Sequence, residues 1–343
     1  MAKFFDGAAE ILFSESGEVS IVISRSLSKD QYEELSKSLF DQKVPIGKIN
    51  LHLKTQDPQD KVELDDNLLA LVTAHNPTAF KLNYFPRGFR EKTLKNLAIL
   101  ISSSPNLKDL DLSDLMLKDK GAALLQEAIT DSSLTKLNLS GNEIGSAYRD
   151  VDDQKMRPLL FILEKNKSLI ELNLSVNNIG HEDLSAITKA LAQNNTLEHL
   201  NLVSNRVKTF TADIKKIQKE AKELAKEPDI ASQEQAAKAK IRVKSFKKSD
   251  AETELTFKSL QQGNLKTLRL SGNLIDSKFA QKLAADFSTS DITLTLNHQG
   301  GEKIKKDEES RPTREKKKPE TSASKASATK AATTAQSHLV SSS

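Results

Sequence analysis

The chain contains no cysteine and no tryptophan, and only 3 of its 343 residues are tyrosine. The absence of cysteine excludes disulfides, thiolate metal ligands and a cysteine nucleophile, and is compatible with a reducing compartment. It also excludes a cysteine-dependent ubiquitin ligase. Tryptophan and tyrosine supply many of the strongest anchors of protein interfaces. Their scarcity favours a polar interface of moderate affinity.

Long hydrophobic runs and catalytic motifs are also missing. No run of about 20 apolar residues occurs, so we expect no membrane span. The N-terminus lacks a basic segment followed by an apolar core, so we expect no secretory signal peptide and a cytoplasmic location. The 6 histidines show no metal-ligand spacing, and no paired-carboxylate, nucleophile-elbow or phosphate-loop motif appears. These absences predict a protein that is not an enzyme and that has no cofactor, metal or small-molecule substrate.

What the sequence does contain is a short apolar motif, L-x-L, which returns nine times. The clearest copies extend it to L-x-x-L-x-L-x-x-N: Leu134, Leu137, Leu139, Asn142; Leu169, Leu172, Leu174, Asn177; Leu197, Leu200, Leu202, Asn205; and Leu265, Leu268, Leu270, Asn273. A fifth copy has Leu115 in place of the asparagine. Such a period is the primary signature of a repeat architecture.

Each repeat combines the patterns of a strand and a helix. Alternation at every second residue predicts a short strand with one buried face. Helical spacing follows, as in Leu184, Ile187 and Leu191. Such a unit cannot bury its apolar face alone, so the repeats must stack. The turn asparagine can bond backbone groups where the chain leaves the strand, so we expect a ladder of these amides; Leu115 predicts a looser rung.

These motifs resemble the leucine-rich repeat family, in its ribonuclease-inhibitor-like subtype. The resemblance implies an α/β solenoid with a curved parallel sheet inside and helices outside. We expect a cap over residues 1–17, the solenoid over 18–299 and a disordered basic tail over 300–343. The interval of 68 residues between Leu202 and Leu270 predicts a helical basic insertion at 208–248. A monomer is expected.

The insertion concentrates positive charge. Residues 208–248 contain 12 Lys and Arg against 6 Asp and Glu. Ile214, Ile217, Ala221 and Leu224 recur at helical spacing, which predicts a hairpin of two helices. Its surface is either exposed to solvent without a binding role or a contact for an acidic protein, an anionic membrane or a nucleic-acid backbone.

In the leucine-rich repeat family the residues between the buried leucines point into the concave face. With Leu51 and Ile23 in equivalent positions, the column between the leucines runs through Val22, Asn50, Lys81, Asp111, Asn138, Asn173, Asn201, Arg269 and Thr295. The stretch 83–90 adds three aromatic and two arginine residues. The candidate partner-binding residues are Arg25, His52, Lys81, Tyr84, Arg87, Asp111, His199 and Arg269.

The resemblance implies a non-catalytic scaffold that binds a protein partner. The last residues, 337–343, follow a polar tail with an acidic cluster at 307–309. That arrangement is similar to the C-terminal secretion signals of type IV effectors in Legionella-type bacteria, which would deliver the chain to the host cytoplasm to bind a host protein. One alternative is a regulator of a small GTPase, because the same repeat subtype occurs in the GTPase-activating protein for Ran. The other is a membrane or nucleic-acid tether acting through the insertion.

Overall fold

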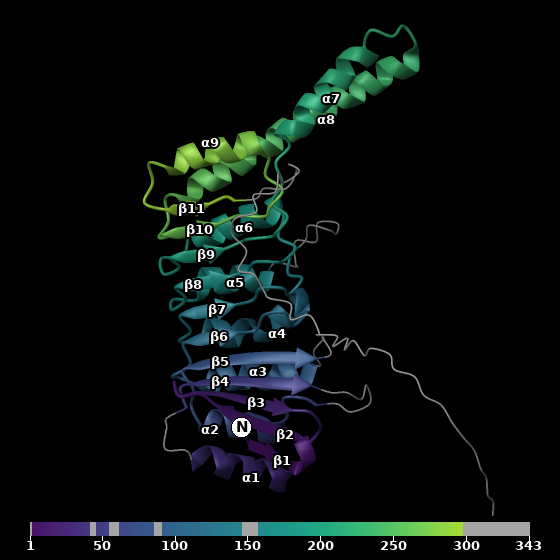
Figure 1. The fold of residues 1–343 in the computed structure, drawn as a ribbon. Helices are drawn as coiled ribbons and strands as arrows, with labels where there is room; N and C mark the ends of the chain where they lie inside the picture. Colours follow the sequence, from purple (N-terminus) through teal and green to yellow (C-terminus); the bar gives the residue numbers. More distant parts are fainter. Residues whose placement is uncertain (1, 42–45, 55–61, 86–90, 146–156, 298–343) are drawn as a thin grey trace, which may run out of the picture. The chain divides into compact units, whose positions relative to one another are not determined.

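The computed structural model describes residues 2–41, 46–54, 62–85, 91–145 and 157–297. Eleven strands in these residues form one sheet in sequence order (Figure 1). The strands are β1 (Ala2–Phe4), β2 (Ala9–Phe13), β3 (Glu18–Ile23), β4 (Lys48–Lys54), β5 (Ala79–Phe85), β6 (Asp109–Asp111), β7 (Lys136–Asn138), β8 (Glu171–Asn173), β9 (His199–Asn201), β10 (Thr267–Arg269) and β11 (Thr293–Thr295). Neighbours are parallel from β3 onward, which confirms the predicted parallel repeat sheet.

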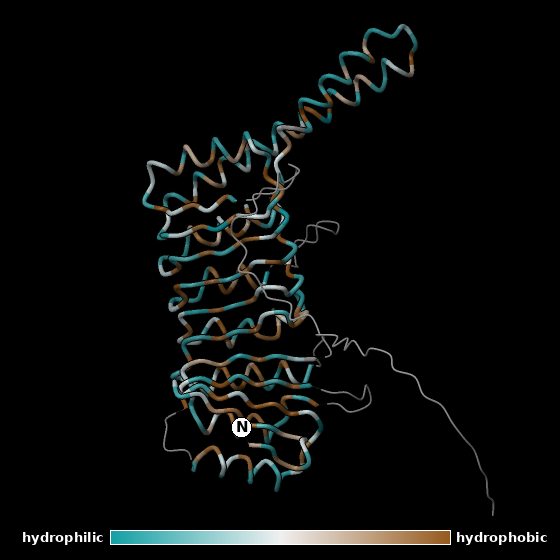
Figure 2. The backbone as a smooth tube through the Cα atoms, viewed as in Figure 1, coloured by the Kyte–Doolittle hydropathy of each residue, from teal (hydrophilic) through white to brown (hydrophobic). Residues whose placement is uncertain are grey.

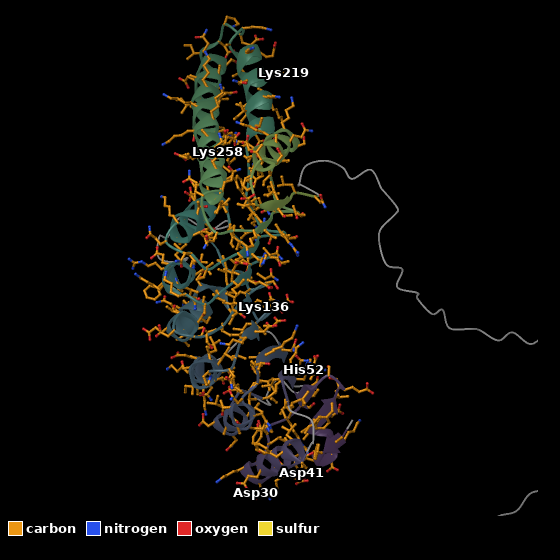
Figure 3. The ribbon with its side chains drawn as sticks, turned by 90° about the vertical axis from the view of Figure 1, so that its left-hand side faces the viewer. Asp30, Asp41, His52, Lys136, Lys219 and Lys258 are labelled. Carbon is orange, nitrogen blue, oxygen red and sulfur yellow. The ribbon has the colours of Figure 1, made fainter. Side chains whose placement is uncertain are left out.

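Helices cover one face of this sheet, except for a pair that projects beyond it (Figures 1 and 3). They are α1 (Lys29–Phe40), α2 (Asp66–Ala74), α3 (Glu91–Ser103), α4 (Lys118–Thr130), α5 (Arg157–Lys165), α6 (His181–Leu191), α7 (Thr211–Leu224), α8 (Ile230–Leu260) and α9 (Ser277–Phe287). The motif leucines fill the space between the two layers, and Leu110, Leu137 and Leu172 are each at most 2% exposed. Hydrophobic residues recur through strands and helices along the stack (Figure 2). Burial of this shared face is what makes the repeats stack.

The first strands continue the sheet beyond the repeats. Strand β2 pairs antiparallel with β3, with Ala9 beside Ile23, and the short β1 pairs with β2. The 3-10 turn η1 (Phe5–Gly7) connects them. These strands occupy the edge of β3 that the predicted N-terminal cap was expected to cover. Backbone groups of β3 that would be open at this edge are paired with β2.

The register of β3 differs from the prediction. Ile21, and not Ile23, lies beside Leu51. Ser20 therefore takes the place that we predicted for Val22, in the column of Asn50 and Lys81. The sequence could not decide this because Ile21 and Ile23 are both fully buried and both fit the motif. A shift of two residues keeps every side chain on its face, so hydrophobic alternation does not distinguish the two registers.

The predicted helical insertion is present as α7 and the first half of α8. Val243 of α8 packs with Ile214 and Ile217 of α7 in a small separate core. The expected end at residue 248 is not a structural boundary, because α8 continues without a break to Leu260. Its second half carries Phe257, which is buried in the main core. The helix of the insertion and the helix of the next repeat are thus one. No helix in the described ranges is long and apolar enough to cross a membrane.

The predicted asparagine ladder runs through the turns after the strands. Its members are Asn142, Asn177, Asn205 and Asn273. Asn177 Nδ2 donates to the carbonyl of Leu139 (2.9 Å) in the preceding rung, and its Oδ1 accepts from the backbone N–H groups of Asn142 and Ile144 (both 3.0 Å). Asn142 repeats this contact one rung earlier. Each amide therefore satisfies backbone groups that the core would otherwise leave unpaired.

Leu115 takes part in this ladder through its backbone. It is 1% exposed, and its N–H donates to Oδ1 of Asn142 at 3.1 Å. Because each asparagine amide reaches the rung before its own, the rung that lacks an amide is the one before Leu115. Residues 86–90 of that repeat lie outside the described ranges, so the looser rung stays a prediction.

One turn position requires a left-handed backbone in every described repeat that carries the motif. Gly141 and Gly272 occupy it with φ of 68° and 71°, whereas Val176 occupies it with φ of 56°. A β-branched residue is strained there, and Val176 is 58% exposed, so little packing offsets the strain.

We expect Val176→Gly to raise the free energy of unfolding by about 0.5–1 kcal/mol in urea denaturation, with a smaller change for Val176→Ala. A loss of stability in the glycine variant would contradict this interpretation.

Candidate functional site

The face of the sheet opposite the helices, called the open face here, presents regular columns of polar side chains. His52 and Lys136 mark this side of the sheet in Figure 3. The column between the buried residues reads Ser20, Asn50, Lys81, Asp111, Asn138, Asn173, Asn201, Arg269 and Thr295. Two residues earlier a second column reads Glu18, Lys48, Ala79, Asp109, Lys136, Glu171, His199, Thr267 and Thr293.

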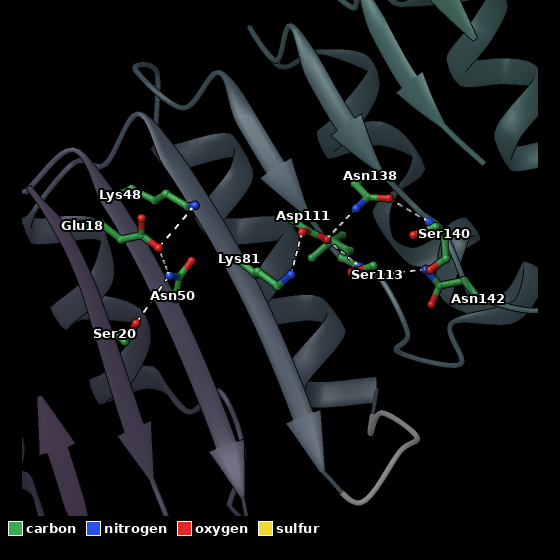
Figure 4. A network of polar contacts seen from close by, with 11 residues as sticks. Glu18, Ser20, Lys48, Asn50, Lys81, Asp111, Ser113, Asn138, Ser140 and Asn142 are labelled. Atoms are coloured by element: carbon green, nitrogen blue, oxygen red, sulfur yellow. Dashed lines mark hydrogen bonds and ion pairs between the residues drawn. The ribbon is translucent and has the colours of Figure 1, made fainter. Parts of the chain in front are cut away.

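In the first half of the open face two lysines are paired with carboxylates. Lys81 Nζ lies 2.9 Å from Asp111 Oδ2, and Lys48 Nζ lies 3.4 Å from Glu18 Oε1 (Figure 4). Burial opposes ionisation of Asp111, but hydrogen bonds from Lys81 and Ser113 outweigh it and lower the pKa of the carboxyl. These lysines are therefore committed to carboxylates on neighbouring strands.

Hydrogen bonds fix the asparagine amides of the column. Asn173 Oδ1 accepts from the N–H of Ser175 (3.0 Å), and Asn201 Oδ1 accepts from the N–H of Val203 (3.1 Å). Asn138 Oδ1 accepts in the same way from the N–H of Ser140, and Asn138 Nδ2 donates to Asp111 Oδ1 at 3.0 Å. The Nδ2 groups of Asn173 and Asn201 make no such bond to another described residue. Because their oxygens are engaged, these two amides present donors to the solvent side.

Arg269 extends this row of donors by one strand. It pairs in register with Asn201, is exposed, and makes no ion pair with any residue that the structure describes. By contrast, Lys136 on β7 lies 2.7 Å from Glu171. Arg269 is thus a cation beside the asparagine amides that remains available to a ligand.

A groove of about 650 Å³ runs across this part of the open face. Its lining consists of Asp109, Asp111, Lys136, Leu137, Asn138, Glu171, Leu172, Asn173, His199, Leu200, Asn201, Thr267 and Arg269. On its floor, His199 Nδ1 lies 2.9 Å from Thr267 Oγ1, which fixes the imidazole ring. The groove has no phenylalanine or tyrosine among its described lining residues, and its contacts are polar.

Comparison with known proteins identifies the repeat. The family described as Leucine Rich repeat matches residues 130–147, 165–187 and 193–209. The chain is a leucine-rich repeat protein. The mouse NACHT, LRR and PYD domains-containing protein 14 is 27% identical over 130 residues, which is 36% of this chain and 13% of the relative. The human protein of that name is 32% identical over 96 residues, 28% of this chain and 8% of the relative. The chain thus matches only a small part of these proteins.

Solved structures with partial likeness include two other proteins. The TLR13–ssRNA13 complex aligns with 81% of this chain and 28% of that chain, at 16% identity and a TM-score of 0.41. A Bacteroides fragilis protein aligns with 82% of this chain and 75% of that chain, at 12% identity and a TM-score of 0.38.

The leucine-rich repeat sheet brings together part of the predicted site. Asp111, His199 and Arg269 line the groove, and Lys81 reaches it through its ion pair with Asp111. His52 lies on the open face four strands away from β8 and outside the groove. The predicted set therefore divides into a groove group and residues at the other end of the sheet.

Three predicted residues are not on the open face of the described structure. Tyr84 pairs in register with the buried Leu53 and packs against the core, because alternation along β5 directs it to the helix side. Arg25 follows β3, where its Nη2 donates to the carbonyl of Phe5 at 2.8 Å. Arg87 lies outside the described residues. The interpretation of Tyr84 as a concave-face anchor was wrong.

Apart from His199, the second column of the groove was not predicted. Asp109, Lys136, Glu171 and Thr267 precede the motif leucines by one residue and line the groove. Continuing the alternation by two residues would have identified them. Within the described ranges, no group of three or more His, Asp or Glu residues is placed to hold a metal ion.

His52 gives the open face a pH-dependent contribution to stability. Burial, followed by repulsion from Lys54 and Lys81, lowers the pKa of His52 below 6.5. The unfolded chain therefore binds the proton more tightly, so the contribution is complete above about pH 6.5 and is lost as the pH falls through the folded pKa. We expect His52→Gln to lose less stability than the parent between pH 7.5 and pH 5.5 in urea denaturation. Equal losses of unfolding free energy in the parent and in His52→Gln would contradict this role of His52.

Proposed function

We propose that this leucine-rich repeat protein is a non-catalytic scaffold that binds an acidic segment of a partner protein in the groove across β6–β10. The row of donors formed by Asn173, Asn201 and Arg269 carries the proposal. These residues lie on consecutive strands of the sheet, which are about 4.8 Å apart. They therefore span about 10 Å, a length suited to successive acceptor groups of an extended peptide.

The chemistry of the row favours carboxylates. Both amides are oriented by backbone bonds to their oxygens, so their donors need no reorganisation when a ligand binds. Arginine adds a planar guanidinium that matches a carboxylate with two hydrogen bonds. A strongly apolar partner surface has little to bury here, because the described groove lining contains only leucines between polar side chains.

The test compares two arginine variants of the full chain. A displayed library of random peptides is selected in parallel against the parent, Arg269→Ala and Arg242→Ala. Arg242 is an exposed arginine of α8, away from the groove, and makes no ion pair with a described residue. We expect acidic peptides to be enriched on the parent and on Arg242→Ala, and to bind Arg269→Ala with about 30-fold lower affinity, as for a truncation worth about 2 kcal/mol.

Two results would contradict the proposal. Enriched peptides without acidic residues would remove the chemistry assigned to the donor row. Equal loss of binding in both arginine variants would show that overall charge, and not the groove, decides the selection.

The cellular context stays a prediction. The translocated-effector hypothesis depends on residues 307–309 and 337–343, which lie outside the described ranges, and the matched relatives are mouse and human proteins. Its test is whether residues 300–343 direct a reporter through a type IV secretion system. Regulation of a small GTPase also stays a prediction, and stimulated GTP hydrolysis across a panel of these enzymes would test it.

A further inference from the structure

The second helix of the hairpin insertion, α8, carries a segment with charge of one sign. Residues 238–248 contain six cations and no carboxylate: Lys238, Lys240, Arg242, Lys244, Lys247 and Lys248. All six are exposed. Lys248 lies 3.6 Å from Glu252, and the other five make no ion pair with a described residue. The positive charge of this segment is therefore largely uncompensated within the described structure.

Three of these cations form a stripe along α8. Lys240, Lys244 and Lys247 follow the spacing i, i+4, i+7, so they share one side of the helix at separations of about 5–6 Å. The apolar side of α8 is already used, because Val243 packs against Ile214 of α7. The lysine stripe, as we call these three residues, faces solvent, and the exposed Ile241 lies beside it on α8.

The lysine stripe leads into a cavity of about 360 Å³ between α7, α8 and α9. Lys247 lines this cavity together with Lys278 and Lys282 of α9. The carboxylates in the lining have other partners. Asp250 accepts from the N–H of Phe210 (2.7 Å), and Glu254 binds Lys258 (2.8 Å) and Lys282. Lys282 is thus neutralised by Glu254, whereas Lys247 and Lys278 make no ion pair with a described residue.

A like-charge contact lies beside this cavity. Lys278 is the main cause that lowers the pKa of Lys215 on α7, while the nearby Asp276 raises it. Two ammonium groups in contact repel each other, and an anion placed beside both would relieve the repulsion. Lysines from three helices thus converge where the lysine stripe ends.

We propose that the lysine stripe and the cavity at its end bind the phosphodiester backbone of a nucleic acid. Evenly spaced lysines act as point charges that follow a phosphate backbone without reading bases. A flat bilayer surface cannot fill a concave cavity, and Ile241 beside the stripe offers a bilayer little apolar surface, because Val243 packs against α7. Protein interfaces are depleted in lysine, so a protein ligand fits this surface less well.

The proposal is tested by titrating a labelled 20-nucleotide single strand with the full chain at 50 to 200 mM salt. The first variant changes Lys240, Lys244 and Lys247 to glutamine. The matched control changes Lys216, Lys219 and Lys222 of α7 to glutamine. These lysines are exposed, and their replacement removes the same net charge from the same hairpin. Circular dichroism melts confirm that both variants fold.

We expect the stripe variant to bind about tenfold or more weakly at 50 mM salt, and its slope of log K against log salt to fall in magnitude by about 2. The control is expected to stay within about threefold of the parent. A single Lys278→Gln change should lower the slope by about 0.7. Equal weakening by both triple variants, or no binding at 50 mM salt, would overturn the proposal. Binding to anionic vesicles in preference to the single strand would assign the surface to a membrane instead.

Discussion

Replacing Asn177 by alanine is expected to lower the free energy of unfolding by about 4 kcal/mol. Asn177 is 5% exposed, and its amide serves both the turn before it and its own. Without the amide, the backbone N–H groups of Asn142 and Ile144 and the carbonyl of Leu139 lose their side-chain partner. Each buried group left unsatisfied costs about 1–3 kcal/mol. Urea denaturation followed by circular dichroism measures the loss.

The neighbouring Asn178 supplies the control for this experiment. It is half-buried, and its side chain only accepts a long contact of 3.4 Å from Arg206 Nε. Asn178→Ala is therefore expected to cost less than about 1 kcal/mol. Similar losses at the two positions would contradict the assignment of the ladder as the main polar support of the stack.

Replacing Phe257 by alanine is expected to cost about 3–5 kcal/mol, as for other fully buried aromatic residues. Phe257 is 0% exposed in the second half of α8, and its ring centroid lies 6.4 Å from that of Phe279 in α9. This side chain joins the helix that carries the hairpin to the core of the final repeats. Phe257→Ala should therefore also raise the rates of amide hydrogen exchange in α7 and α8.

Leu255, two residues earlier on the same helix, is the matched control. It is 66% exposed, so Leu255→Ala is expected to change the free energy of unfolding by less than about 0.5 kcal/mol. If Phe257→Ala cost no more than this control, the second half of α8 would not be the helix of a repeat. Hydrogen exchange in α7 that stays unchanged when Phe257 is lost would show that the hairpin folds independently of the stack.

The sequence predicted the fold well because the repeat carries its information locally. Strand alternation, helical spacing and the turn asparagine return in each unit, so each copy supports the assignment of the others. The prediction was less accurate where one pattern fits two arrangements. Ile21 and Ile23 fit either register of β3, and the sequence of α8 contains no signal at residue 248 for a boundary.

The candidate groove was predicted in part. Asp111, His199 and Arg269 were recognised as charged or ionisable residues near the motif leucines, and they line the groove. Tyr84 was assigned to the wrong face, since the prediction took its aromatic character and set aside its place in the alternation. The predicted column placed Asp111 beside Lys81, but only the structure shows that the two side chains form an ion pair. Lys81 and Arg269 occupy the same column, and only the presence of Asp111 on the adjacent strand distinguishes them.

By itself the sequence determined that the chain forms stacked units of strand, turn and helix, because each unit needs its neighbours to bury its leucines. It also determined where charge accumulates along the chain. The tertiary structure decided which side chains share a face across strands up to 68 residues apart, as for His199 and Thr267. It decided which lysines are neutralised by carboxylates and that one helix serves both the insertion and a repeat. These features depend on distances between separate repeats, and the order of residues within one repeat does not contain them.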